Sequence, residues 1–228
     1  MMRTFKQALV RRLQESLNES VSEESGAVLV DGDGHRDYVG GMWEALGTLQ
    51  FRFLVDQGLE PQHVLLDIAC GALRGGVRFI PYLQPGHYLG IEMHQKLIDA
   101  GIEKELGQKL YALKKPELVV SDKFEFSRFS RQPDFALAQS LFSHLTADDI
   151  TLCLKNLRAV ATSGAKFYAS FFESERLENN AVRSEPRGKF LYTRDQMAHF
   201  GAATGWSSRY IGDWKHPRDQ KMFEYSAV

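Results

Sequence analysis

The sequence predicts an α/β domain with a mostly parallel sheet and helices on both of its faces. Along most of the 228 residues, short apolar runs alternate with segments of helical periodicity. This alternation favours parallel strands, because a parallel crossover needs a helix-length connection. Only a short turn, 214–218, lies between the last two runs, 206–211 and 222–228. The final strand is therefore predicted to be antiparallel.

The remaining elements follow from periodicity and from residues typical of helix ends. Helices are expected at 3–20, 39–56, 73–81, 95–113, 146–161 and 193–204. Strands are expected at 63–69, 87–92, 117–121, 134–138 and 165–172. Thr146 and the Thr193/Gln196 pair are typical of helix starts, whereas Gly58 is typical of a helix end. Helix 95–113 contains Gly101 and Gly107 and is expected to be interrupted.

Two long segments are expected to be loops. Residues 20–37 and 173–192 are polar and charged, and they lack a sustained apolar period. Residues 1–58 are interpreted as an N-terminal helical cap or lid and 59–228 as the main domain. Phe5, Leu9, Leu13 and Leu17 recur every fourth residue, so helix 3–20 is predicted to pack on the domain surface; a lid or a homodimer through this helix is the alternative.

Composition narrows the class of protein. The formal net charge is −1, which argues against a nucleic-acid partner. The two cysteines lie in apolar segments, as expected in a reducing compartment. No apolar run reaches the roughly 20 residues of a membrane span, and the first residues lack the apolar core of a secretion signal. We therefore expect a cytoplasmic enzyme with no membrane partner and no metal site.

The most informative stretch, 65–76, is predicted to form a buried strand, a tight turn and the start of a helix. Asp67 ends the strand, and Gly71 lets the backbone approach a ligand. Glu92 ends the next strand, 21 positions after Gly71, where an acid binds ribose hydroxyls in dinucleotide folds. A solvated or helix-capping acid is the alternative for Glu92 alone, but the joint placement favours a binding site.

Further candidates lie at the ends of the next strands. Asp122 and Phe124 offer a carboxylate and an aromatic face. Gln139 ends the fourth expected strand, and His144 follows it. His144 and His216 are the candidate acid–base residues, with His35 as a further possibility. For each histidine a structural role is the alternative.

Three segments resemble motifs of the class I S-adenosylmethionine-dependent methyltransferases. Residues 66–71 (LDIACG) resemble motif I, residues 90–92 (GIE) resemble the acidic motif II, and residues 134–145 resemble the fourth motif. The resemblance implies a seven-stranded Rossmann-like sheet with its antiparallel last strand inserted next to the edge. It also implies S-adenosylmethionine as the cofactor.

The resemblance further assigns roles to individual residues. Asp67, Ala69 and Gly71 would lie near the methionine and ribose, and Glu92 would bind the ribose hydroxyls. Asp122 and Phe124 would contact the adenine, and Gln139 would lie near the sulfonium.

The turn departs from the family pattern at two positions. Many members have glycine where Ala69 and Leu73 stand. We therefore expect the turn to tighten through Gly71 and the Gly75–Gly76 pair instead.

The expected reaction is methyl transfer to a small-molecule acceptor, with oxygen ahead of nitrogen. No DPPY-like tetrapeptide follows the fourth expected strand, which argues against methylation of nucleic-acid bases.

Basic residues gather in the loop after the fifth expected strand and favour an anionic acceptor if that loop covers the pocket: Arg176, Arg183, Arg187 and Lys189. The alternatives are a non-catalytic scaffold and, disfavoured by the missing G-x-G-x-x-G and Tyr-x-x-x-Lys motifs, a nicotinamide-dependent oxidoreductase.

Overall fold

The computed structural model describes residues 34–227. The chain divides into two compact units, one ending at Gly41 and the other beginning at Met42, and each is considered by itself. The predicted helix 3–20 lies outside the described residues. Among the described residues, no helix is long and apolar enough to cross a membrane.

The described part of the first unit contains one short helix, α2 (Gly34–Tyr38). The prediction of a loop was therefore wrong for residues 34–37. The helix ends where Gly40 and Gly41 take positive φ angles of 88° and 62°, which other residues adopt only at a cost. Their N–H groups donate to the carbonyls of Asp37 and Arg36.

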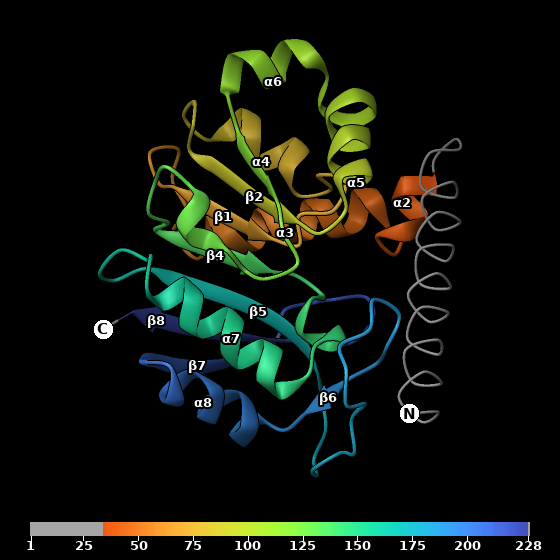
Figure 1. The fold of residues 1–228 in the computed structure, drawn as a ribbon, viewed down its shortest axis with the longest axis vertical. Coiled ribbons are helices and arrows are strands. Elements are labelled where there is room, and N and C mark those ends of the chain that lie inside the picture. Colours follow the sequence, from red (N-terminus) through yellow and green to blue (C-terminus); the bar gives the residue numbers. More distant parts are fainter. Residues whose placement is uncertain (1–33, 228) are drawn as a thin grey trace, which may run out of the picture. The chain divides into compact units, whose positions relative to one another are not determined.

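The second unit holds the sheet (Figure 1). Its strands are β1 (Leu65–Ile68), β2 (Tyr88–Glu92), β3 (Glu117–Val120), β4 (Phe135–Ala138), β5 (Lys166–Glu173), β6 (Leu191–Tyr192), β7 (Trp206–Asp213) and β8 (Lys221–Ala227). Its helices are α3 (Trp43–Asp56), α4 (Gly76–Tyr82), α5 (Gln95–Ala100), α6 (Gln108–Lys114), α7 (Ala147–Arg158) and α8 (Arg194–Ala203), with a π-helix η1 (Gly101–Leu106) and the 3₁₀ turns η2 (Phe126–Arg128) and η3 (Phe142–His144).

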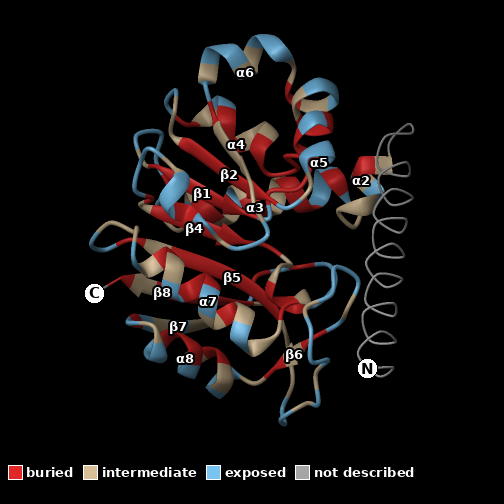
Figure 2. Ribbon diagram, viewed as in Figure 1, coloured by how far each residue is buried: buried red, intermediate tan, exposed pale blue. Residues whose placement is uncertain are grey.

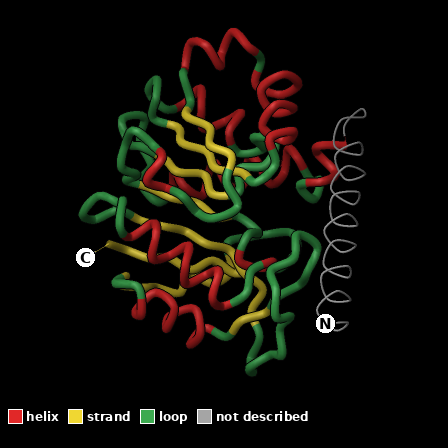
Figure 3. The backbone as a smooth tube through the Cα atoms, viewed as in Figure 1, coloured by secondary structure: helices red, strands yellow, loops and turns green. Residues whose placement is uncertain are grey.

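The strand order confirms the predicted topology. The sheet runs β3-β2-β1-β4-β5-β8-β7. Strands β1 to β5 pair in parallel, whereas β8 pairs antiparallel with both β5 and β7. The two-residue strand β6, which pairs with β5 outside this order, was missed inside the predicted loop 173–192 (Figure 3). Two residues are too few for an alternation pattern.

Both faces of the sheet are covered by apolar side chains. Leu66 and Ile68 belong to one buried cluster, with side chains of α7 and α8. Leu65 belongs to a second cluster, with side chains of α3 and α4. Successive strand residues point to opposite faces, so β1 is buried on both sides, as Figure 2 shows for the central strands.

Several predicted helix ends are confirmed. The Thr146 hydroxyl accepts from the Asp149 N–H at the start of α7, and Thr193 and Gln196 form a reciprocal capping box on α8. The expected helix 95–113 is interrupted: it becomes α5, η1 and α6, with Gly107 at φ 82° between the last two.

The strand order reverses between β1 and β4, because β2 and β3 lie on one side of this pair and β5 on the other. In open α/β sheets, ligands bind beyond the carboxyl ends of the strands at such a point. Asp67, Glu92 and Gln139 lie at or directly after the carboxyl ends of β1, β2 and β4.

Candidate functional site

The turn after β1 takes an unusual backbone path. Ala69, Gly71 and Leu73 all have positive φ angles, of 58°, 56° and 65°. For a non-glycine residue this conformation costs about 1–2 kcal/mol, and such strain gathers at functional sites. Ala69 is exposed, whereas its neighbours Ile68 and Cys70 are buried. The turn therefore exposes Ala69 at the sheet edge, whereas Gly71 is buried beneath it.

The expectation that Gly75 and Gly76 tighten this turn was wrong. Gly75 is helical, with φ −75° and ψ −39°, and Gly76 begins α4. Their small size serves packing instead: a Cβ on Gly75 would lie 2.6 Å from the Gln50 side chain, and one on Gly76 would lie 2.9 Å from Leu73. Leu73 takes the left-handed conformation itself, because its fully buried side chain stabilises a backbone that the sequence alone disfavours.

Asp67 is a buried carboxylate at the end of β1, 6% exposed. The Tyr88 hydroxyl donates a hydrogen bond of 2.7 Å to its Oδ2 atom. Burial raises the pKa of Asp67 to about 6, although the bond from Tyr88 and the charge of Arg74 both lower it. A cation beside this carboxylate would offset the cost of its burial.

Glu92 binds the turn directly. Its Oε2 atom accepts from the Gly71 N–H and its Oε1 atom from the His94 N–H, both at 3.1 Å. Burial raises its pKa, while the backbone hydrogen bonds lower it. Each carboxylate oxygen has two lone pairs, so both oxygens can still accept from a ligand hydroxyl. The structure thus brings Gly71 and Glu92, which the sequence assigned to one site, into direct contact.

Asp122 and Phe124 lie in the loop after β3. Asp122 is exposed and Phe124 is half-buried, with a positive φ of 54°. The Phe124 carbonyl accepts from the Asn156 side chain at 3.1 Å, which fastens the loop to α7. Because β3 is parallel to β2, both residues lie at the same sheet edge as Glu92, one strand further out.

Gln139 is the centre of a buried hydrogen-bond network after β4. Its Oε1 atom accepts from Arg74 and, at 2.7 Å, from Gln50. Its Nε2 atom donates to the Ser140 hydroxyl and lies 3.1 Å from Nε2 of His216. The network therefore joins α3, the β1–α4 turn, β4 and the β7–β8 hairpin.

His216 is 5% exposed, and both of its ring nitrogens face N–H groups. Nδ1 accepts from the Arg218 N–H at 3.2 Å, and Nε2 faces the Gln139 amide. A protonated imidazole has two donors and no acceptor, so it does not fit this environment. In agreement, burial and then the charges of Arg218 and Arg74 lower the pKa of His216 to about 4.

A second set of hydrogen bonds anchors the hairpin. Gln220 Oε1 accepts from the hydroxyls of Ser170, at 2.7 Å, and Ser140, at 3.0 Å. The Ser140 N–H donates to Ser170 Oγ at 2.7 Å, and Ser140 has a positive φ of 60°. These bonds hold the hairpin against the carboxyl ends of β4 and β5.

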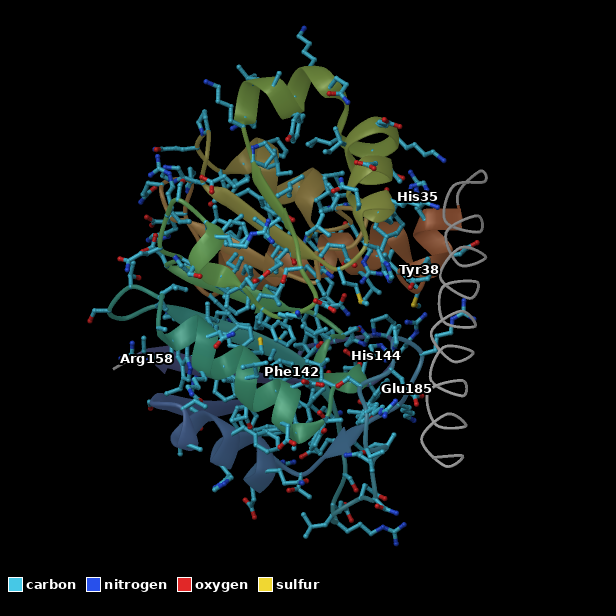
Figure 4. The ribbon with its side chains drawn as sticks, viewed as in Figure 1. His35, Tyr38, Phe142, His144, Arg158 and Glu185 are labelled. Atoms are coloured by element: carbon cyan, nitrogen blue, oxygen red, sulfur yellow. The ribbon has the colours of Figure 1, made fainter. Side chains whose placement is uncertain are left out.

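His144 lies in η3 (Figure 4) and holds the loop after β5. Its Nδ1 atom lies 2.6 Å from the Gly188 carbonyl, so Nδ1 carries the proton and Nε2 the lone pair. Its own carbonyl accepts from the Glu185 N–H at 3.0 Å. His144 therefore has the structural role that the sequence left as its alternative, since its ring and its carbonyl both bond to the backbone of this loop. The four basic residues of this loop, Arg176, Arg183, Arg187 and Lys189, are all exposed.

Sequence reasoning missed Gln50, Arg74 and Gln220. Gln50 could have been noticed in the sequence, because it is a polar residue at a position where the helical period of Leu46 and Leu54 predicts an apolar one. Arg74 is 8% exposed, and burial lowers its pKa to about 10 although the charge of Asp67 raises it. A buried arginine needs compensating partners, but the sequence alone does not show that it is buried.

Comparisons with known proteins give the fold. No known family model matches the sequence. The magnesium protoporphyrin IX methyltransferase of Synechocystis PCC 6803, solved with bound SAM, superposes with a TM-score of 0.60 at 13% identity, covering 96% of each chain. A glycopeptide N-methyltransferase matches with a TM-score of 0.61 at 16% identity, covering 80% of this chain and 90% of the other.

A third similar structure is an amino pentose methyltransferase from Micromonospora echinaspora. It covers 84% of this chain and 94% of its own, with a TM-score of 0.56 at 15% identity. The chain therefore has the Rossmann-like fold of the class I S-adenosylmethionine-dependent methyltransferases, as the sequence motifs predicted.

Proposed function

We propose that this chain transfers a methyl group from S-adenosylmethionine to a small-molecule acceptor, at oxygen ahead of nitrogen. The observation that carries the proposal is the arrangement of Asp67, Gly71 and Glu92: two buried acids on adjacent parallel strands, one of them bonded to the backbone of the turn between them. The methyl-transferase fold supports it.

The residues present fit this cofactor. The buried Asp67, whose pKa burial raises to about 6, gains from a neighbouring cation, and the cofactor has both an ammonium group and a sulfonium. Glu92 has acceptor capacity for the two ribose hydroxyls. Ala69 and Gly71 would lie against the methionine and ribose, and Asp122 with Phe124 at the adenine.

Methyl transfer from a sulfonium needs few catalytic side chains. When bound, the sulfonium supplies an already activated methyl group, so the chain must align the acceptor and exclude water. Gln139, fixed by four hydrogen-bond partners, is proposed to define the position of the sulfonium. A hydroxyl acceptor must also lose a proton. Of the two candidate bases, His144 is the one that we propose, because its Nδ1 bonds to the Gly188 carbonyl and leaves the Nε2 lone pair to take a proton, and burial lowers its pKa so that the ring is neutral at pH 7. His216 would have to break a contact with an N–H group before it could take a proton.

Calorimetry with the full chain tests the proposal against its alternatives. We expect saturable binding of S-adenosylmethionine and S-adenosylhomocysteine and no binding of NADH. Binding of NADH alone would favour the oxidoreductase alternative. Binding of none of the three would favour the scaffold alternative, and either result would refute the proposal.

A further inference from the structure

Tyr88, the first residue of β2, reaches the carboxylate at the end of β1. In the parallel register, Leu65 pairs with Tyr88 and Asp67 pairs with Gly90. Side chains two positions apart on a strand lie on the same face of the sheet, so Tyr88 and Asp67 are diagonal neighbours on that face. The Tyr88 hydroxyl spans this diagonal and donates to Asp67 Oδ2 at 2.7 Å. The pairing of the two strands thus places a phenol against the first acid of the candidate site.

Two glycines leave room for the phenol ring. A Cβ on Gly90, the cross-strand partner of Asp67, would lie 3.2 Å from Cε1 of Tyr88. A Cβ on Gly76, at the start of α4, would lie 3.0 Å from the Tyr88 hydroxyl oxygen. Both distances are shorter than ordinary van der Waals contact between carbon atoms, and Tyr88 is 2% exposed. The position of the hydroxyl is therefore fixed by close packing.

The direction of the hydrogen bond follows from burial. Burial raises the pKa of Tyr88 well above its usual range, so at neutral pH the hydroxyl keeps its proton and the carboxylate accepts. The other charged groups that act on Asp67 are Arg74, which favours its ionised form, and Glu92, which disfavours it. Among the described residues, Tyr88 is the hydrogen-bond donor to this side chain and bonds to Oδ2, which leaves Oδ1 for a ligand.

We propose that Tyr88 is a positioning residue for the methyl donor: its hydroxyl keeps Asp67 ionised and turns Oδ1 toward the cationic part of S-adenosylmethionine. This inference rests on the proposed function and adds a residue that acts through Asp67. A hydrogen bond to a carboxylate favours its ionised form and so opposes the effect of burial. Without the hydroxyl, Asp67 should take up a proton at a higher pH and lose its attraction for a cation.

The test uses the full chain with Tyr88→Phe, which removes the hydroxyl and keeps the ring. Binding of S-adenosylmethionine is measured by calorimetry between pH 5 and pH 8. We expect the midpoint of the fall in affinity to move to higher pH by about one to two units, as for the loss of a hydrogen bond to a charged group. At pH 7 the affinity should then fall about two- to tenfold. 5′-Methylthioadenosine has the adenine, the ribose and the sulfur but neither cation, and its affinity should stay unchanged.

Two further variants make the test specific. Tyr225→Phe removes another buried tyrosine hydroxyl, which donates to the Met197 carbonyl at 3.0 Å, and should keep the wild-type pH profile. In an Asp67→Asn background the profile should be flat with or without the Tyr88 hydroxyl, because the charge on which the hydroxyl acts is absent.

Urea denaturation of the ligand-free chain gives a second measurement. The pKa of Asp67 is about 6, so its carboxylate is mostly ionised at pH 7 and mostly protonated at pH 5. The bond from Tyr88 stabilises the ionised form. Tyr88→Phe should therefore lower the denaturation midpoint more at pH 7 than at pH 5, whereas Tyr225→Phe should lower it equally at both.

The outcomes separate this inference from the proposed function. A flat wild-type pH profile, an unchanged midpoint in Tyr88→Phe, or an equal loss of affinity for both ligands would overturn the inference. An equal loss of stability at both pH values, or a Tyr88→Phe chain that is unfolded at both, would assign the hydroxyl to folding alone and would also overturn it. Failure of the wild type to bind S-adenosylmethionine would refute the proposed function, and the inference with it.

Discussion

The candidate site has two halves, one at the ends of β1 and β2 and the other at the ends of β4 and β5. They differ in the kind of polar group that each buries. At the ends of β1 and β2, the buried polar groups are two acids, Asp67 and Glu92. Burial raises the pKa of the neighbouring Cys70 thiol, and the charges of both acids raise it further. At the ends of β4 and β5, the buried polar groups are amides, hydroxyls and an imidazole held neutral. One half is built to receive a cation, and the other forms a rigid neutral frame with arginines beside it.

This difference predicts that substitutions in the two halves have different consequences. Changes in the neutral frame should affect folding, since its hydrogen bonds join distant elements, most of them through Gln139 and Gln220. Changes in the acidic half should affect cofactor affinity, because its groups have acceptor capacity left for a ligand. Three experiments test this division, and a fourth tests the backbone strain of the turn beside the acids; they are given in order of decreasing effect.

The largest expected effect is that of Gln139→Leu. The leucine cannot bond to Arg74, and a buried charge that loses a partner is strongly destabilising. We expect the free energy of unfolding to fall by about 3 kcal/mol, toward the lower end of the 3–5 kcal/mol for a broken buried pair, measured by urea denaturation. Gln84→Leu, at an exposed position after α4, is the control and should change it by less than about 0.5 kcal/mol. Equal stability of the two variants would contradict the neutral frame.

Glu92→Ala should act mainly on binding. We expect the affinity for S-adenosylmethionine to fall by roughly 1.5–3 kcal/mol, the worth of charge-assisted hydrogen bonds, as measured by calorimetry. Glu103→Ala, an exposed acid of η1, should bind as the wild type does. An unchanged affinity in Glu92→Ala would remove this residue from the site.

The pH dependence of binding should report on Asp67. Its pKa of about 6 means that acidification protonates the carboxylate and removes its attraction for a cation. Between pH 7 and pH 5 we expect the affinity for S-adenosylmethionine to fall about tenfold, since about one-tenth of the carboxylate is ionised one unit below its pKa. His216, whose pKa is about 4, stays neutral over this range.

The matched variant for this experiment is Asp67→Asn. It should bind more weakly than the wild type at pH 7 and show a flat profile from pH 7 to pH 5. A wild-type profile that is equally flat would show that Asp67 does not face the ligand cation.

The smallest expected effect is that of Ala69→Gly. Glycine relieves a positive φ that costs about 1–2 kcal/mol but adds about 0.5–1 kcal/mol of backbone entropy to the unfolded chain. We expect a gain in the free energy of unfolding of about 0.5 kcal/mol, measured by thermal denaturation. Ala72→Gly, at a fully buried position whose φ is not positive, should be destabilising. A loss of stability in Ala69→Gly would show that the turn is not strained there.

The acidic half of the site could be predicted from local sequence. Asp67 and Glu92 each follow an apolar run, and two such runs separated by a helix place their carboxyl ends at one edge of a parallel sheet. The neutral frame could not be predicted in this way. Gln50 and Gln139 are 89 positions apart, and neither has a neighbour in sequence that indicates the other.

The order of strands and helices, the helix caps at Thr146 and Thr193, and the antiparallel last strand were determined by the sequence itself. These features depend on periodicity, on capping chemistry and on the length of one connection, all of which are local. Tertiary structure decided the left-handed backbone at Leu73, the helical conformation of Gly75 and the bonding of Gln139 to three distant elements. Each of these depends on burial, because a polar group or a strained residue inside the protein is stable only with partners that packing brings from elsewhere in the chain.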